Sequence, residues 1–166
     1  MNAPNPSTLT TAPLRHRIRL ELHAPVAEVW SLVGDHERLP EYSEGIERVT
    51  IVEDDEGRAR VCHFRPQDGV SMSIRERIRW EAPNTGYATT SEPGNDFGLT
   101  NDATIVTLEP TPAGTSFTWA QHYDHPDLPF MRAGFHQGLL DIARRLLARF
   151  GGRMVEELVD EPVQMG

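Results

Sequence analysis

The sequence has one cysteine, no lysine and no long apolar run. The single cysteine, Cys62, excludes an internal disulfide and any Cys-x-x-Cys metal or redox pair. No stretch reaches the ~18 apolar residues that a membrane span needs, and the first residues lack the basic-then-apolar order of a secretory signal. These absences lead us to expect a cytoplasmic protein that is not inserted in a membrane.

Basic charge is also scarce. The chain has 16 basic residues, all of them arginine and scattered along the chain, against 25 acidic ones, and its formal net charge is -9. Nucleic acids and anionic membranes repel such a chain, and no basic stripe compensates. We therefore expect a small or neutral partner and no nucleic acid.

The length of 166 residues fits a single domain. A chain of about 150 residues buries roughly two-thirds of the surface that it exposes when unfolded. Residues 1–13 are rich in Pro, Ser, Thr and Asn and predict a flexible leader. Periodic apolar residues place the domain at 14–152, and the acidic segment 153–166 is predicted to be a loosely packed tail.

Hydrophobic periodicity predicts an early strand, two short helical segments and then a run of strands. Apolar and polar residues alternate over 14–23, and apolar residues recur at helical spacing between Pro25 and Val33. Residues 35–45 are predicted to form a second, shorter helix or loop. Further strands, separated by Gly, Pro, Asn and Asp turns, are expected at residues 46–53, 58–65, 70–80, 87–91, 103–109 and 115–123.

A long amphipathic helix is predicted over residues 128–150, ending at Gly151. At 100° per residue, Leu139 marks the centre of its buried stripe, and Arg132 and His136 fall near that stripe. Short turns between the strands favour an antiparallel meander. The fold class is therefore α+β: a curved antiparallel sheet of about six to seven strands that wraps around this helix and tends to enclose a cavity.

Three segments carry a family likeness: APVAEVWSLVGDHERLPEY, RERIRWEAP and LEPTPAGTSFTW. In this order and spacing they resemble the START-like or Bet v 1-like (SRPBCC) superfamily, in particular its polyketide cyclase/dehydrase branch, over about residues 14–150. The resemblance implies a helix-grip fold with a ligand cavity between the sheet and the long helix. It also implies a gate at one end of the cavity, formed here by residues 66–69 and 92–101.

The same resemblance implies a function. The cavity would bind a hydrophobic, partly oxygenated small molecule such as a polyketide, lipid or terpenoid. A polyketide cyclase/dehydratase-like enzyme would hold a flexible chain so that aldol-type ring closure and dehydration become intramolecular. The alternative is a non-catalytic carrier or chaperone for a lipid or another hydrophobic ligand, and a partner-binding module with a filled core is a third. We expect no cofactor, and a monomer or homodimer.

Glu76 is the only carboxylate on the apolar face of its predicted strand. That face also carries Val70, Met72, Ile74, Ile78 and Trp80. A carboxylate buried without a partner costs several kcal/mol or takes up a proton. We predict that Glu76 faces the pocket as a hydrogen-bonding group or a general acid/base. The alternative is that it pairs with an arginine of the same sheet.

Arg132 and His136 are the next candidates for catalysis. Arg132 would stabilise an enolate oxygen at the mouth of the cavity, and His136, one turn further on, would relay protons. The alternatives are that Arg132 extends past the end of the helix into solvent and that His136 is a satisfied boundary residue.

The last predicted strand carries alternating aromatic and polar residues. If Phe117 and Trp119 face inward, Gln121 and Tyr123 do so too. The pattern Trp-x-Gln-x-Tyr resembles one found in bacterial aromatase/cyclases, and Tyr123 would join the proton-moving groups. For Trp119 the alternative is simple packing against the helix.

The resemblance implies further ligand-binding positions on neighbouring strands and on the helix. They are Tyr42, Phe64, Met72, Tyr87, Asn101 and Phe135. Ser43 follows Tyr42 where the hormone receptors of the superfamily have a lysine, so a ligand carboxylate is not expected to be anchored there.

Two polar clusters are given structural interpretations. His122, Asp124, His125 and Asp127 match no zinc spacing, and we predict a solvated corner with helix-capping acids and no metal site. Five arginines on two predicted strands are expected to form a solvated outer face of the sheet: Arg58, Arg60, Arg75, Arg77 and Arg79.

Overall fold

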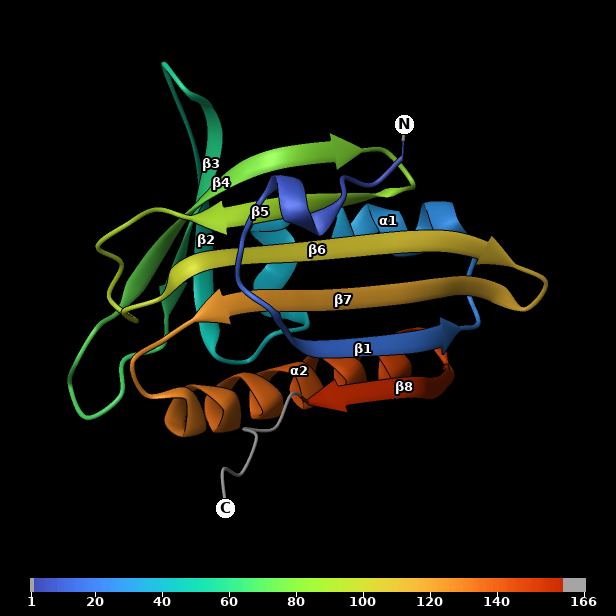
Figure 1. Ribbon diagram of the computed structural model, residues 1–166. Helices are drawn as coiled ribbons and strands as arrows, with labels where there is room; N and C mark the ends of the chain where they lie inside the picture. Colours follow the sequence, from blue (N-terminus) through green and yellow to red (C-terminus); the bar gives the residue numbers. More distant parts are fainter. Residues whose placement is uncertain (1, 160–166) are drawn as a thin grey trace.

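Alternating apolar and polar residues build one antiparallel sheet of eight strands in this computed structural model, which describes residues 2–159 (Figure 1). The strands are β1 (Leu14–Leu22), β2 (Ile46–Asp54), β3 (Gly57–Phe64), β4 (Ser73–Ala82), β5 (Gly86–Ser91), β6 (Thr100–Thr111), β7 (Gly114–Asp124) and β8 (Gly152–Val159). The helices are η1 (Pro6–Thr8), α1 (Val26–Val33), η2 (His36–Glu41) and α2 (Leu128–Phe150), of which η1 and η2 are 3-10 helices.

The strand order is β2-β3-β4-β5-β6-β7-β1-β8, so the meander from β2 to β7 is closed by the first strand. The long helix α2 packs against β1 and β8, and α1 and η2 follow β1 (Figure 1). The predicted α+β fold, with a curved sheet around a long C-terminal helix, is confirmed, although the sheet has eight strands instead of six to seven. Within residues 2–159, no helix is long and apolar enough to cross a membrane.

The extra strand comes from the segment predicted to be a loose tail. Gly151 and Gly152 adopt φ angles of 74° and 125°, which lets the chain reverse directly after α2. β8 then pairs antiparallel with β1, from His16 opposite Val159 to Leu22 opposite Gly152. The prediction of a loosely packed tail is therefore wrong for residues 153–159, which belong to β8, and the rest of that segment lies outside the described residues.

The predicted flexible leader is also partly ordered. Asn5 caps η1, and Ala12 and Thr10 are buried. The Thr10 hydroxyl donates to the carbonyl of Asn101, on β6, and the leader runs across the sheet there (Figure 1). Hydrogen bonds between a polar leader and a distant strand leave no periodic pattern in the sequence, which is why the expectation failed.

The core lies between the sheet and α2. Inward residues of β1 and β7 meet the buried stripe of α2, which includes Leu139 as its predicted centre. The main members of this layer are Ile18, Leu20, Leu22, Phe117, Trp119, Leu139, Ile142 and Leu146. Burying a side chain of this size stabilises the fold by roughly 1.5–3 kcal/mol, so this layer fixes the position of α2 over the inner face of the sheet.

Candidate functional site

A buried ion pair occupies the inner face of the sheet. Nε of Arg60 lies 3.0 Å from Oε1 of Glu76, and the register places the two residues directly opposite each other on β3 and β4. The Thr89 hydroxyl donates to Oε2 of Glu76 over 3.1 Å, and the Cys62 thiol lies 3.3 Å from Oε1. The inward position of Glu76 agrees with the prediction, and its partner is the arginine of the same sheet that was the alternative interpretation.

Arg60 was misassigned to the outer face. Strand alternation puts it on the same side as Cys62, and its side chain is only 2% exposed. Its Nη1 donates to Nδ1 of His36 over 3.1 Å. Nδ1 of His36 is therefore an acceptor, and Nε2 carries the proton that it donates to Glu81 over 3.0 Å. Burial, followed by the charge of Arg60, lowers the pKa of His36 to about 3.

Two tyrosine side chains lie beside this ion pair. The Tyr87 ring is 4.7 Å edge-on from His36, and Nη1 of Arg60 donates to the Tyr87 oxygen over 3.4 Å. Tyr42, at the end of η2, is buried and close enough to Tyr87 for the two phenols to interact electrostatically. The Tyr42 hydroxyl makes no hydrogen bond of standard distance and angle with residues 2–159, and its interaction with the Tyr87 phenol is weaker than such a bond. Both predicted ligand-binding tyrosines thus face the interior.

A second polar group lies under the first half of α2. The Tyr123 hydroxyl is 2.8 Å from Nε2 of His16, and the two rings are stacked at 5.6 Å. Phe135 of α2 packs on Tyr123 with ring centroids 4.9 Å apart. Trp119 and Gln121 lie on the same face of β7, and neither Nε1 of Trp119 nor Oε1 of Gln121 has a hydrogen-bond partner among residues 2–159.

Arg132 and His136 lie on the same helix but in different surroundings. Arg132 is buried, with only 7% of its surface exposed. It therefore does not extend into solvent, as the alternative interpretation had it. His136 is half-buried, and its Nε2 lies 3.2 Å from Oε1 of Glu157 on β8. This contact favours the alternative interpretation, in which His136 is a boundary residue whose hydrogen bonds are made within the protein.

The predicted gate loops lie at the same end of the sheet. Phe97, in the second loop, packs edge-on against Phe64 of β3 with ring centroids 4.6 Å apart. Oδ2 of Asp96 accepts from the backbone N–H of Ser73, 2.9 Å away, and the His125 ring bonds to the carbonyl of Phe97 at 2.8 Å. These contacts join the β5–β6 loop to the facing ends of β3 and β4 and to the β7–α2 loop, and all three connections lie at the same end of the sheet (Figure 1).

Two hollows open at this rim. One, of about 160 Å³, is lined by Glu47, Arg48, His63, Phe64, Ser71, Met72 and Ser73. The other, of about 200 Å³, is lined by Ser73, Arg75, Glu92, Pro93, Gly94, Asn95 and Asp96. Phe64 and Met72, both predicted to bind ligand, thus lie at the rim, and neither hollow extends to the inward residues of β7 or α2.

Asn101 differs from the other predicted ligand-binding residues. It is exposed, at a φ of 57° beside the irregular start of β6. Its side-chain amide donates to Thr11 of the leader and to Asp124, over 2.5 and 3.4 Å. Asn101 therefore holds the leader on the sheet and does not line the interior.

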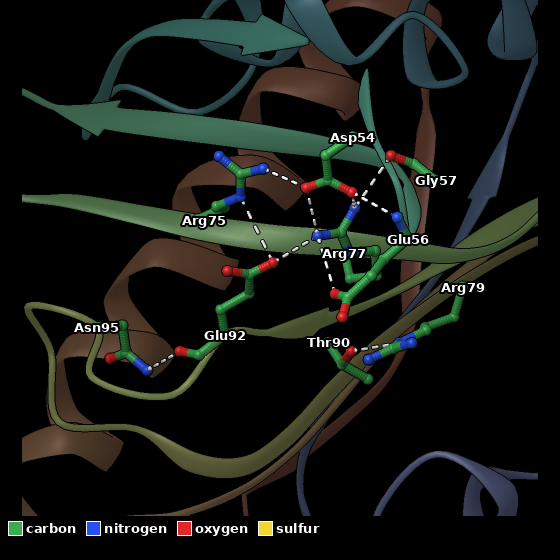
Figure 2. Close-up of polar contacts among 9 residues, drawn as sticks. All are labelled: Asp54, Glu56, Gly57, Arg75, Arg77, Arg79, Thr90, Glu92 and Asn95. Carbon is green, nitrogen blue, oxygen red and sulfur yellow. Dashed lines mark hydrogen bonds and ion pairs between the residues drawn. The ribbon is translucent and has the colours of Figure 1, made fainter. Parts of the chain in front are cut away.

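The outer face of the sheet carries an ionic network that anchors a gate loop (Figure 2). Arg77 donates to Asp54 over 2.9 Å and to Glu92 over 2.7 Å, and Arg75 bonds to the same two acids. Because Glu92 begins the second gate loop, the network ties that loop to the β2–β3 hairpin. These acids cover Arg77, which is only 3% exposed and so is not the freely solvated residue that was predicted.

The acid- and histidine-rich corner is structural. Asp127 caps α2, its Oδ1 accepting from the backbone N–H of Phe130 over 3.2 Å, so the predicted capping role is confirmed. His122 bonds to the carbonyl of Ala12, and Asp124 to Arg15. In the part of the chain that the structure describes, no group of three or more His, Cys, Asp or Glu side chains is arranged to hold a metal ion.

Sequence reasoning missed Asp102 as a titratable group near the site. It accepts from the backbone N–H and hydroxyl of Ser91, bridging the strands at the base of the second gate loop. Burial raises its pKa to about 6. Asp102 is the only acid between Leu99 and Leu108. A single carboxylate in such a segment is the sequence signal that could have identified it.

Solved structures share this fold. Protein XoxI from Bacillus cereus is 23% identical, with a TM-score of 0.66 over 82% of this chain and 95% of that chain. Ara h 8.0201 is 17% identical, with a TM-score of 0.65 over 82% and 97%. The di-domain ARO/CYC StfQ from the steffimycin biosynthetic pathway is 13% identical, with a TM-score of 0.64 over 81% of this chain and 50% of that chain. At these identities the likeness shows the fold alone, and that fold is the predicted curved antiparallel sheet around a long C-terminal helix.

Sequence comparison gives a more specific result. The profile of a family described as polyketide cyclase/dehydrase and lipid transport matches residues 15–161, which is nearly the whole chain. No curated protein matches the chain in sequence.

Proposed function

Because the chain belongs to the polyketide cyclase/dehydrase and lipid transport family, we propose that it binds a largely apolar, partly oxygenated small molecule between its sheet and α2. The ligand would lie along β7, with α2 as its cover and the end closed by Phe64 and Phe97 as its entrance. The exposed rim hollows are smaller than the ~300 Å³ typical of ligand sites. Binding would therefore require the gate loops to separate.

One observation carries this proposal. The Tyr42 hydroxyl, the Trp119 indole N–H and the Gln121 amide oxygen are buried atoms that have no hydrogen-bond partner among residues 2–159. A buried polar group without a partner costs ~1–3 kcal/mol, so three of them along one apolar interior favour a ligand that supplies the missing partners. They offer two donors and one acceptor, which suits a ligand with a few oxygen atoms on an apolar body.

Binding without chemistry is the function that the geometry favours. Both oxygens of Glu76 already accept hydrogen bonds, from Arg60 and Thr89, and His36 cannot readily take up a proton. Cyclase/dehydratase-like catalysis is the second candidate, favoured by the Tyr123–His16 hydrogen bond. Tyr123 could protonate an alkoxide formed by ring closure and regain its proton through His16.

Ligand binding can be tested through tryptophan fluorescence. The chain has three tryptophans. Trp119 lies on the inner face of β7, and Trp30 is on α1. A register shift after Ile78 pairs Trp80 with Ala88, so Trp80 lies on the outer face of β4 and not, as predicted, on the face of Glu76. Titration with Nile red, a neutral apolar dye, should quench Trp119, and Trp119→Phe should remove most of the quenching. Trp30→Phe and Trp80→Phe are the matched controls and should retain it. Absence of saturable dye binding, or quenching that survives in Trp119→Phe, argues against an interior site.

Turnover separates the two candidates. A carrier should release a linear poly-β-ketone thioester unchanged, whereas a cyclase should convert it to ring products. If products form, Tyr123→Phe should suppress them by at least tenfold while retaining dye binding, since only the proton donor is lost. Product formation that is insensitive to Tyr123→Phe rules out this proton donor.

A further inference from the structure

Two phenols lie beside a buried guanidinium in the deepest part of the interior. Tyr42 and Tyr87 are 2% and 0% exposed. The Tyr87 oxygen accepts from Nη1 of Arg60, while the Tyr42 hydroxyl is without a hydrogen-bond partner in the described part of the chain. A hydroxyl that loses its water on folding without gaining a partner remains available to a ligand. We refer to Tyr42 and Tyr87 as the phenol pair.

The phenol pair presents donors, not acceptors. Burial raises the pKa of Tyr87, and burial followed by the neighbouring phenol raises the pKa of Tyr42 well above its usual value. Both hydroxyls therefore keep their protons at neutral pH. Since the Tyr87 oxygen accepts from Arg60, its own O–H proton can point elsewhere, as can that of Tyr42. A ligand atom that accepts one or two hydrogen bonds fits this position.

The surrounding charges decide which acceptor is preferred. The positive charge of Arg60 is matched by Glu76 at 3.0 Å, and His36, which accepts from the same guanidinium, is neutral. The cluster is thus electrically balanced before any ligand arrives. A carboxylate would add an unmatched buried charge, which is unfavourable. A carbonyl oxygen would satisfy the same donors without adding charge.

We propose that the phenol pair binds the carbonyl oxygen of a neutral, largely apolar ligand such as a ketone or an ester, in preference to a free carboxylic acid. This inference rests on the proposed function, since the carbonyl must be carried by a ligand inside the sheet. It adds the chemical class of that ligand and assigns Tyr42 and Tyr87 as the residues that recognise it.

Three probes of equal length test the assignment: a ten-carbon methyl ketone, the ten-carbon carboxylic acid and the ten-carbon alkane. Each is titrated at neutral pH against bound Nile red, with wild type and with Tyr42→Phe. Wild type should bind the ketone several-fold more tightly than the alkane and the acid. Loss of one hydrogen bond should weaken ketone binding by about three- to tenfold in Tyr42→Phe, with alkane binding unchanged.

Folding of the variants provides a second measurement. Tyr42→Phe removes a hydroxyl that has no partner, so the melting temperature of the ligand-free protein should not fall. Tyr87→Phe removes an acceptor of Arg60 and should lower the melting temperature as well as the ketone affinity. A clear fall in the melting temperature of Tyr42→Phe would mean that its hydroxyl is already engaged, which contradicts the inference.

The binding outcomes distinguish this inference from the function on which it rests. Equal affinities for ketone and alkane, or full ketone affinity in Tyr42→Phe, overturn the carbonyl subsite but leave apolar binding in place. Tighter binding of the acid than of the ketone overturns the charge argument. If neither Nile red nor any probe binds, the proposed function fails and the carbonyl subsite with it.

Discussion

Arg60 and Glu76 face each other across the inner surface of the sheet, with Nε of Arg60 3.0 Å from Oε1 of Glu76. The strand register pairs them directly, so each is the counter-ion that allows the other to be buried. The guanidinium also contacts His36 and Tyr87, and it joins the β3–β4 pair to η2 and to β5. The ion pair is therefore the centre of a buried polar network, and its loss affects several elements at once.

Removing one member of the pair should be far more damaging than removing both. Arg60→Met leaves Glu76 buried without its counter-ion, and we expect the free energy of unfolding to fall by about 3–5 kcal/mol. The double variant Arg60→Met/Glu76→Leu should recover most of that loss, because apolar groups can replace a buried pair. Urea unfolding measures both. A double variant that is less stable than Arg60→Met would contradict this account.

His36 should make the protein less stable in acid. Its folded pKa of about 3 lies below the usual 6.5, so between these values the unfolded chain binds a proton that the folded protein does not. The free energy of unfolding therefore falls as the pH drops from 6.5 towards 3, by an amount on the order of a few kcal/mol. His36→Gln can still accept from Arg60 and donate to Glu81, and it should lose this dependence. An unchanged acid profile in His36→Gln would argue that His36 is protonated in the folded state.

Asp102 should act in the opposite direction. Its folded pKa of about 6 lies above the usual 3.8, so between these values the folded protein holds a proton that the unfolded chain has lost. The free energy of unfolding should therefore fall as the pH rises from 3.8 to 6. Asp102→Asn keeps an acceptor for Ser91 and removes the charge, so its stability relative to wild type should increase across this range. If the difference in the free energy of unfolding between Asp102→Asn and wild type stays constant over this pH range, the pKa of Asp102 is not raised.

The inner face of the sheet was predictable because strand parity is a local property. Alternation alone places Glu76 and Trp119 inward, and the structure agrees. The same rule, applied to RARVCHF, would have placed Arg60 inward beside Cys62, but a run of arginines resembles a solvated surface. A buried arginine is recognisable only when its counter-ion is known, and Glu76 is on another strand.

Features that depend on distant pairing could not be read from the sequence. β8 has no regular alternation, and its partner β1 lies more than a hundred residues earlier in the chain. The leader is held by hydrogen bonds between Thr10 or Thr11 and Asn101, which involve polar residues that are typical of loops. The hydrogen bond between His16 and Tyr123 joins residues 107 positions apart. In each case the two partners come together only when the sheet has formed.

The contact between Phe64 and Phe97 should control how fast a ligand enters and leaves. An aromatic pair of this geometry contributes about 0.5–1.5 kcal/mol beyond the area that it buries, and it joins the second gate loop to the end of β3, two residues before the first gate loop. Phe97→Ala should therefore open the gate more often, raising both the association and the dissociation rate of Nile red by about two- to tenfold, with little change in affinity. Stopped-flow fluorescence measures both rates.

Phe130→Ala is the matched control for this prediction. Phe130 lies in the first turn of α2 and is 71% exposed, so removal of its ring should leave both rates unchanged. If Phe97→Ala lowers the affinity without raising the association rate, Phe97 is part of the binding surface and not of a gate. If neither rate responds, the ligand enters elsewhere. Faster exchange in Phe97→Ala alone would place the entrance at this end of the sheet, because Phe97 contacts Phe64 and His125 there.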